Sequence, residues 1–229
     1  MEFINESREK KEKFKNYVIL GIGEGGGESA DAYERPITQY NSVRRKIEQG
    51  ATYISIDKLL FRPNKNKKKN LKEEWALFAN YVEIKKDFQR NNPNMERYFI
   101  KGDMSSLPLP DESVNEIWIE NVLSLVKKGR RIILNELLRV LKNDGKIYLS
   151  EYYTPSELNK FLLRYKNKLE NDKNVRVNIF SGKNMFVKMI ELGLSREDII
   201  SIFSVANLSC SLGFTKMEDV FLMEIVKNK

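Results

Sequence analysis

The sequence predicts an α/β fold in which an open, mostly parallel sheet with an antiparallel C-terminal strand carries helices on both faces. Two observations lead to this fold class. Short apolar runs alternate along the chain with longer segments of helical periodicity. Several of these runs are apolar on both faces, as strands of a parallel sheet covered on both sides must be. A glycine cluster, GIGEGGG, follows the first run, which makes the predicted fold Rossmann-like.

Six apolar runs are the predicted strands. Each is short, contains β-branched or aromatic residues, and ends at polar or glycine-containing sequence. In chain order they are Tyr17–Ile22, Thr52–Asp57, Arg97–Asp103, Val114–Glu120, Gly145–Tyr152 and Asp219–Val226.

Helix-like segments lie between the strands, at residues 39–50, 70–90, 129–145, 154–172 and 195–213. The segment at 129–145 is expected to keep Lys142 in its last turn, because basic residues and a following glycine are common at helix C-termini. The charged segment at 6–16 is expected to form a helix over the edge of the sheet.

No linker-like stretch divides the 229 residues, which suffice for one substantial core. We therefore expect one domain over residues 1–229, with insertions at about 61–96 and 165–195. The second insertion includes VRVNIF at 175–180, which alternates like a strand, and a short helix-like stretch after it.

Composition excludes several kinds of chemistry. The chain has no histidine and one cysteine, Cys210, so serine–histidine and cysteine–histidine catalysis and a cysteine-based zinc cluster are excluded, and no metal site is expected. No apolar run approaches the roughly 20 residues that span a bilayer, and the N-terminus lacks the apolar centre of a signal peptide. We expect a soluble, cytoplasmic protein without membrane contact.

The charge permits an anionic partner. The net charge is +8, and the longest basic run extends from Arg62 to Lys72. Clustered lysines gain affinity for nucleic acid by releasing counterions, so RNA binding through this run is one hypothesis. A solvated loop is the alternative.

The glycine cluster and the residue after the next strand indicate a nucleoside ligand. In an open α/β sheet the first strand-to-helix turn contacts the ligand, which places Gly21, Gly23 and Gly25 against it. Asp57 ends the second strand, where a carboxylate can accept both hydroxyls of a ribose. Dinucleotides and S-adenosylmethionine both fit this pattern, and a tight turn or a helix N-cap would explain the same residues without a ligand.

Two further blocks separate these cofactors. GDMSSLPLPDESVNEIWIENVL (102–123) places an aspartate after the third strand, and LNELLRVLKNDGKIYLSEYY (134–153) supplies a helix and the fifth strand. From about Tyr17 to Tyr153 the chain resembles the class I S-adenosylmethionine-dependent methyltransferases. Within that family it is similar to a small-molecule-type subgroup with LPxxDxS and RVLKxxG segments.

The resemblance implies the role of each cofactor contact. Gly21, Gly23 and Gly25 would let the backbone approach the methionine and ribose, and Asp57 would hold the ribose hydroxyls. Asp103 would accept a hydrogen bond from the adenine amino group, while Met104 would pack on the adenine face.

One departure from the family pattern concerns the cofactor's ammonium group. The family usually has an acidic residue two positions before the first glycine, where this chain has Ile19. Glu24 could supply the missing charge. Glu120 is a candidate both for contacting the cofactor and for catalysis.

Residues after the fourth and fifth strands face the methyl group in this architecture. The catalytic candidates at these positions are Glu120, Asn121 and Tyr152, and Glu151 and Tyr153 are further candidates next to them. A glutamate would take the acceptor's proton and a tyrosine would orient the acceptor. Helix capping and half-buried packing are the alternatives for these residues.

The sequence therefore predicts an S-adenosylmethionine-dependent methyltransferase acting on oxygen or nitrogen of a small molecule or peptide. An RNA methyltransferase, a cofactor-binding partner protein without catalysis, and a nicotinamide-dependent oxidoreductase are the alternatives. Neither the acceptor nor the oligomeric state follows from the sequence.

Overall fold

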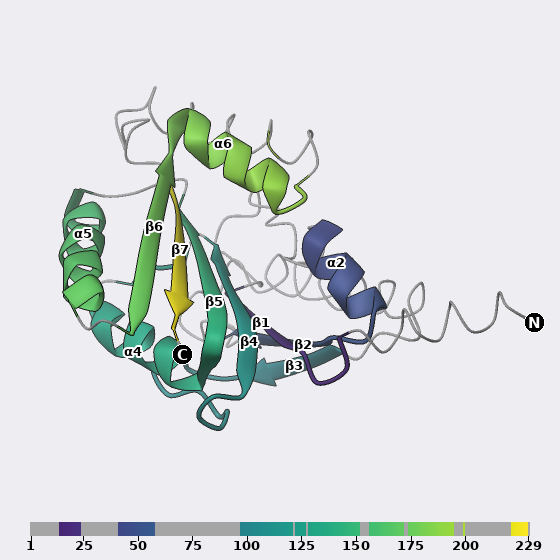
Figure 1. The fold of residues 1–229 in the computed structure, drawn as a ribbon. Helices are drawn as coiled ribbons and strands as arrows, with labels where there is room; N and C mark the ends of the chain where they lie inside the picture. Colours follow the sequence, from purple (N-terminus) through teal and green to yellow (C-terminus); the bar gives the residue numbers. More distant parts are fainter. Residues whose placement is uncertain are drawn as a thin grey trace, which may run out of the picture.

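One seven-stranded sheet lies at the centre of the computed structural model, which describes residues 14–23, 41–57, 97–120, 122–126, 128–151, 156–171, 174–194, 199 and 221–228 (Figure 1). The strand order is β3-β2-β1-β4-β5-β7-β6. The strands are β1 Val18–Ile22, β2 Thr52–Asp57, β3 Arg97–Lys101, β4 Val114–Glu120, β5 Leu141–Glu151, β6 Val175–Ser181 and β7 Phe221–Lys227. β7 pairs antiparallel with both neighbours and the other pairs are parallel, which confirms the predicted fold class.

Helices cover both faces of this sheet, as predicted. They are α2 Asn41–Glu48, α4 Arg130–Val140, α5 Ser156–Asn171 and α6 Gly182–Glu191. α4 and α5 pack against the buried side chains of one face, among them Ile117 and Ile119 of β4. α2 and α6 pack against the other face, where Trp118 lies. The two cores follow from the alternation of side chains along each strand.

The end of α4 differs from the prediction. The helix ends at Val140, and Lys142 belongs to β5 rather than to a last helical turn. The carbonyl groups of Arg139 and Val140 accept hydrogen bonds from the backbone of Glu112 and Ser113, at 3.0 and 2.9 Å. The chain is extended from Leu141 onward, so these carbonyls are satisfied by a neighbouring segment instead of a glycine cap.

The glycine-containing stretch after α4 forms an irregularity within β5. Pairing with β4 shifts register between Val114 and Glu116, and Asp144 has a φ of 60°. A Cβ on Gly145 would lie 2.7 Å from the carbonyl oxygen of Lys142, so this bend requires glycine. The NDG sequence therefore marks a bulge rather than a helix stop.

The stretch at 165–195, interpreted above as an insertion, contributes an edge strand and a helix to the architecture. β6 pairs with β7 from Val175 to Ser181, and α6 follows directly. Phe14–Asn16 form a turn. The expected helices at 70–90 and 195–213 and the lysine run lie outside the described residues, apart from Ile199.

A buried glutamate connects three elements on the α2 side of the sheet. Glu116 of β4 is 1% exposed. Its carboxylate accepts hydrogen bonds from Tyr17 Oη at 2.9 Å and Trp118 Nε1 at 2.6 Å, and it forms an ion pair with Lys46 of α2. Burial and the Glu116 carboxylate raise the pKa of Tyr17 above its ordinary value, so its hydroxyl remains a donor. Glu116 thus joins α2 and the start of β1 to the centre of the sheet.

No helix in the described part of the chain is both long enough and apolar enough to cross a membrane.

Glu116→Ala should lower the free energy of unfolding by about 3–5 kcal/mol, because it leaves the Lys46 cation and two buried donors without their acceptor. Urea unfolding measures this. Glu191→Ala is the matched control, since Glu191 is 61% exposed and its pair with Lys188 is worth at most about 1 kcal/mol. Equal losses for the two variants would contradict a structural role for Glu116.

Candidate functional site

The candidate site lies at the carboxyl ends of β1, β2 and β4. β1 stands between β2 and β4 in the sheet, and the chain proceeds to β2 and β3 on one side and to β4 and β5 on the other. Ligands of open α/β sheets bind where the strand order reverses in this way. The backbones of the predicted cofactor-contact residues that the structure describes lie at or near this edge.

The first two glycines of the cluster have different local environments. Gly21 is buried within β1 and pairs with Ser55 and Trp118 on either side. Gly23 follows the strand with a φ of 78°, and its N–H donates to the Ile56 carbonyl at 3.1 Å. A Cβ on Gly23 would lie 2.2 Å from Cγ2 of Val122, so glycine is required there by the close passage of the loop after β4. Glu24 and Gly25 lie outside the described residues.

The turn after β3 packs against the end of β2. A Cβ on Gly102 would lie 3.0 Å from Cγ2 of Ile56, the residue before Asp57. The register pairs Asp57 with Lys101, so the backbones of Asp57 and Asp103 reach the same edge on adjacent strands. The side chain of Asp57 is outside the described part.

The carboxylate of Asp103 shapes its own turn. Its Oδ1 accepts hydrogen bonds from the backbone N–H of Ser105 at 2.9 Å and from Ser105 Oγ at 2.6 Å. Met104 is partly buried and packs against the core on the α4 and α5 face. Asp103 therefore forms a turn through its hydrogen bonds to Ser105, and it would have to keep these bonds while it binds adenine.

One arginine joins the two blocks on which the family resemblance rests. Arg139 of α4 donates to the carbonyls of Leu109 and Leu107, at 2.9 and 3.1 Å, and to Oδ1 of Asp111 at 2.6 Å. It also binds both oxygens of Glu136, at 2.9 and 3.1 Å, and Glu136 in turn accepts from the Leu107 N–H. Hydrogen bonding to Arg139 lowers the pKa of Glu136. This Arg139 clamp holds the 107–111 segment, which continues the Asp103 turn, against α4.

The residues after β4 and β5 do not all face the same way. Glu120 ends β4 and is partly exposed, on the strand face that carries Trp118. Glu151 ends β5 and is 0% exposed. Asn121, Tyr152 and Tyr153 are outside the described residues.

Glu151 anchors the loop after β4. Its Oε1 accepts a hydrogen bond from the Leu123 N–H at 2.7 Å, and Arg130 Nε donates to the Leu123 carbonyl at 3.1 Å. A carboxylate with no exposed surface cannot reach a substrate proton, so the interpretation of Glu151 as a proton acceptor is replaced by a positioning role. Val122, one residue before this anchor, is the residue that contacts Gly23.

Burial raises the pKa of Glu151 to about 7, although hydrogen bonds from Leu123 and Ser124 and the nearby Arg130 charge act in the opposite direction. Desolvation disfavours the charged form of a carboxyl group. Arg130 and Val122 could not be predicted from the sequence as loop contacts, because neither residue type signals such a role by itself.

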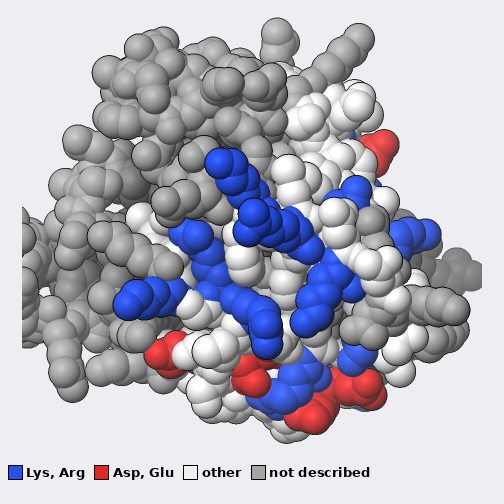
Figure 2. Space-filling view, turned by 90° about the vertical axis from the view of Figure 1, so that its left-hand side faces the viewer, with Lys and Arg blue, Asp and Glu red and all other residues white. Residues whose placement is uncertain are grey.

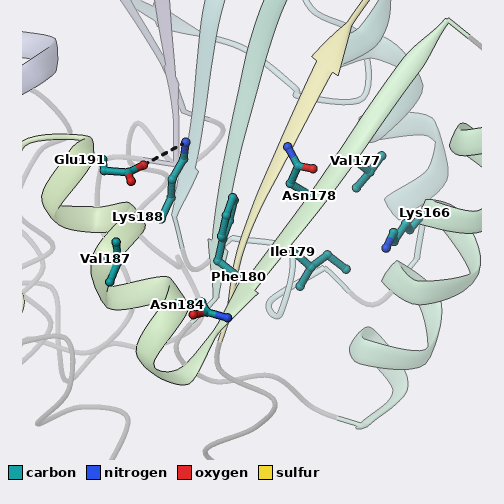
Figure 3. Close-up of a pocket in the computed structure, with 9 residues that line it drawn as sticks. All are labelled: Lys166, Val177, Asn178, Ile179, Phe180, Asn184, Val187, Lys188 and Glu191. Carbon is teal, nitrogen blue, oxygen red and sulfur yellow. Dashed lines mark ion pairs between the residues drawn. The ribbon is translucent and has the colours of Figure 1, made fainter.

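A cavity of about 460 Å³ lies elsewhere, at the free edge of β6 between α5 and α6 (Figure 3). β4, β5 and β7 separate β6 from β1. Lys188 in this cavity forms ion pairs with Glu191 at 3.6 Å and with the buried Glu224 at 3.4 Å, so its charge is already balanced. The cavity is therefore distinct from the candidate site.

Comparison with known proteins gives a family match for part of the chain. Residues 77–149 match the family model described as a methyltransferase domain. This segment includes β3, β4, α4 and most of β5, together with the Arg139 clamp. Over this segment the match agrees with the methyltransferase class predicted from the sequence. No curated protein matches the chain.

Three solved structures with low sequence identity are similar to this chain, and the first two reach a TM-score of 0.50. The plantazolicin methyltransferase BpumL is 17% identical with a TM-score of 0.50, covering 93% of this chain and 77% of its own. The [4+2]-cyclase SpnF is 14% identical with a TM-score of 0.50, covering 99% and 80%. YcgJ from Bacillus subtilis is 15% identical with a TM-score of 0.44, covering 99% and 97%.

Arg139→Ala should lower the free energy of unfolding by about 2–3 kcal/mol, because the Leu107 and Leu109 carbonyls lose this donor and the Glu136 carboxylate keeps only the Leu107 N–H. Arg139→Lys should recover less than half of this loss, since an ammonium group cannot reproduce the planar set of donors. Urea unfolding of both variants, with Arg131→Ala on the exposed side of the same helix as control, measures the effect. A fully stable Arg139→Lys variant would show that charge alone suffices.

Glu151 should make stability depend on pH in a predictable direction. The folded chain holds a proton on Glu151 more tightly than the unfolded chain, so this stabilisation is complete below pH 4.5 and is lost as pH rises through about 7. Glu151→Gln keeps an acceptor for Leu123 without the titration. Between pH 4.5 and 8 the unfolding free energy of wild type should fall relative to this variant by on the order of 3 kcal/mol. Parallel pH profiles from chemical denaturation would refute the raised pKa.

Proposed function

We propose that this chain transfers a methyl group from S-adenosylmethionine to an oxygen or nitrogen atom of a small-molecule or peptide acceptor. The observation that carries the proposal is the position of three features at one sheet edge: the glycine turn after β1, Asp57 at the end of β2 and Asp103 just after β3. The methyltransferase-domain match over residues 77–149 includes the β3 turn.

The chemistry of these residues fits the cofactor. A ribose diol and the adenine amino group donate hydrogen bonds, and carboxylates accept them. Asp57 would bind the ribose hydroxyls and Asp103 the adenine amine, with Met104 beside the adenine ring. S-adenosylmethionine is the cofactor of this chain. In keeping with this, BpumL, which shares the fold, was solved in complex with S-adenosylhomocysteine.

The remaining contacts would hold the amino-acid end of the cofactor. Gly21, Gly23 and Gly25 would give the backbone access to the methionine portion. Ile19 is buried in the α2-side core, so it contributes packing and no charge at the place where the family usually has an acid. Glu24 or Glu120 would then receive the ammonium group.

When bound, the cofactor supplies an electrophilic methyl group on a sulfonium. The protein's task is to hold an acceptor atom in line, about 3 Å from that carbon, which can provide much of the acceleration. Glu120 ends β4 on the sheet edge next to β1 and would take the acceptor's proton. Asn121 and Tyr152 would orient the acceptor.

Among the similar solved structures, only the shared fold supports the proposed acceptor class. BpumL was solved in complex with a triazolic desmethylPZN analog. SpnF, with the same TM-score, is a [4+2]-cyclase, which illustrates that one fold hosts different reactions. Methyl transfer therefore has to be measured directly: mass spectrometry of a cell extract incubated with the protein and an isotope-labelled methyl donor should show one labelled product. Cofactor binding with no labelled product would favour the non-catalytic alternative.

S-adenosylhomocysteine should raise the melting temperature by several degrees and NAD should not, because a ligand that binds the folded state stabilises it by mass action.

Asp103→Asn separates the two roles of Asp103. The asparagine oxygen still accepts from Ser105, so the ligand-free melting temperature should change little, while affinity for S-adenosylhomocysteine should fall roughly ten-fold as an acceptor is replaced by a donor.

Isothermal titration of wild type and Asp103→Asn provides this measurement, and Asp111→Asn, on the exposed rim of the Arg139 clamp, is the matched control. Unchanged affinity in Asp103→Asn would leave Asp103 with its turn-forming role alone. A melting-temperature rise with NAD instead of S-adenosylhomocysteine would overturn the cofactor assignment.

A further inference from the structure

Basic side chains gather on the side of the molecule that Figure 2 shows. Five of them we call the α4/α5 basic face: Arg131 of α4, Lys160, Arg164 and Lys168 of α5, and Lys128, which lies two residues before α4. All five are exposed. The lysine and arginine side chains lie over the centre of the view in Figure 2, and most of the acidic ones lie at its lower rim.

Helix geometry explains the arrangement. Lys160, Arg164 and Lys168 recur every four residues on α5, so successive charges stand about 6 Å apart along one stripe. The opposite stripe of α5 is buried in the core through Leu158, Leu162 and other apolar residues. The charged stripe therefore points outward by necessity.

α4 adds to the stripe because the two helices are in contact. Tyr165 Oη of α5 donates to Asn135 Oδ1 of α4 at 2.8 Å. Burial raises the pKa of Tyr165 to about 12, and the charge of Arg131, one helical turn before Asn135, acts in the opposite direction. Arg131 thus lies beside the α5 stripe, which makes the surface wider than one helix.

Several other cations of the described chain have an acidic partner, whereas the members of this face form no ion pair there. Lys46, Arg139, Lys188 and Lys227 each form an ion pair with a glutamate or aspartate. No ion pair involves the five residues of the α4/α5 basic face in the described structure. Glu136 is the acidic side chain described on these two helices, and it is bound by Arg139. The side chains of Glu157 and Glu170 are outside the described part.

We propose that the α4/α5 basic face binds the phosphate backbone of a single-stranded nucleic acid. Closely spaced, unpaired and exposed cations are the arrangement that gains affinity from counterion release. This surface is separate from the Arg62–Lys72 run. The proposal concerns binding and does not depend on the proposed methyl transfer.

An anionic membrane is the less favoured partner. A helix that lies in a membrane surface buries its own apolar stripe in lipid, whereas the apolar stripe of α5 is inside the protein. The large apolar side chains exposed on these helices are Leu163 and Ile132, at 48% and 57% exposed, one on each helix. Phosphates can approach the five cations without any apolar insertion.

The test is fluorescence anisotropy with a labelled 20-nucleotide single-stranded RNA of mixed sequence, without methyl donor, at several salt concentrations. In the variant Lys160→Gln/Arg164→Gln/Lys168→Gln, binding should weaken roughly ten-fold at low salt. The slope of log affinity against log salt should fall by about 2, since each lost phosphate contact removes about 0.7. A DNA strand of the same length distinguishes the two sugars.

The matched control removes three exposed cations from outside this face, as Lys15→Gln/Arg45→Gln/Arg176→Gln, with the same loss of net charge. It should keep most of the wild-type slope. Equal loss in both variants, or no loss in the first, would overturn the proposal, the latter indicating the Arg62–Lys72 run. Binding of phosphatidylserine vesicles without RNA binding would assign the face to a membrane. If the triple variant melts early, Arg164→Gln and Lys168→Gln alone should each lower the slope by about 0.7.

Discussion

The geometry of the candidate site depends on one planar set of donors, the guanidinium group of Arg139. It binds two backbone carbonyls of the 107–111 segment, the Asp111 carboxylate and both oxygens of Glu136. The segment it holds has no regular structure and begins just after the Asp103 turn. Without Arg139 of α4, the backbone carbonyls of Leu107 and Leu109 would lack this hydrogen-bond donor, and the loop would not be held in one conformation. The site edge is therefore positioned by a helix on one face of the sheet.

A second constraint acts on the same edge from β5. Glu151 holds the Leu123 N–H, Arg130 holds the Leu123 carbonyl, and the adjacent Val122 fills the space where Gly23 would have a side chain. The loops after β1 and β4 thus share a contact that only glycine permits. A glycine expected to approach a cofactor is here also required by protein packing, so substitution at Gly23 would disturb two loops before any ligand is bound.

The sequence predicted the sheet well because its signal is local. Thr52–Asp57 and Val114–Glu120 have the predicted bounds, since apolar runs between turn-forming residues define strands without reference to the rest of the chain. The end of α4 was wrong because its carbonyls are satisfied by Glu112 and Ser113, which are distant in sequence. The role of β6 as an edge strand depends on pairing with β7, about 45 positions later, which alternation alone cannot reveal.

The site was predicted less completely for the same reason. Asp103 and Gly23 could be selected from their positions after strands, but their actual neighbours, Ser105 and Val122, depend on how loops fold against each other. Glu151 shows most clearly why position at a strand end does not predict a role. Residues 120 and 151 both end strands at the same edge of the sheet. Because side chains alternate along a strand, Glu120 lies on the face of Trp118 and Glu151 lies in the core on the opposite face. One carboxylate can therefore meet a ligand while the other can only position a loop. A strand-end glutamate becomes a catalytic candidate only when its face is known.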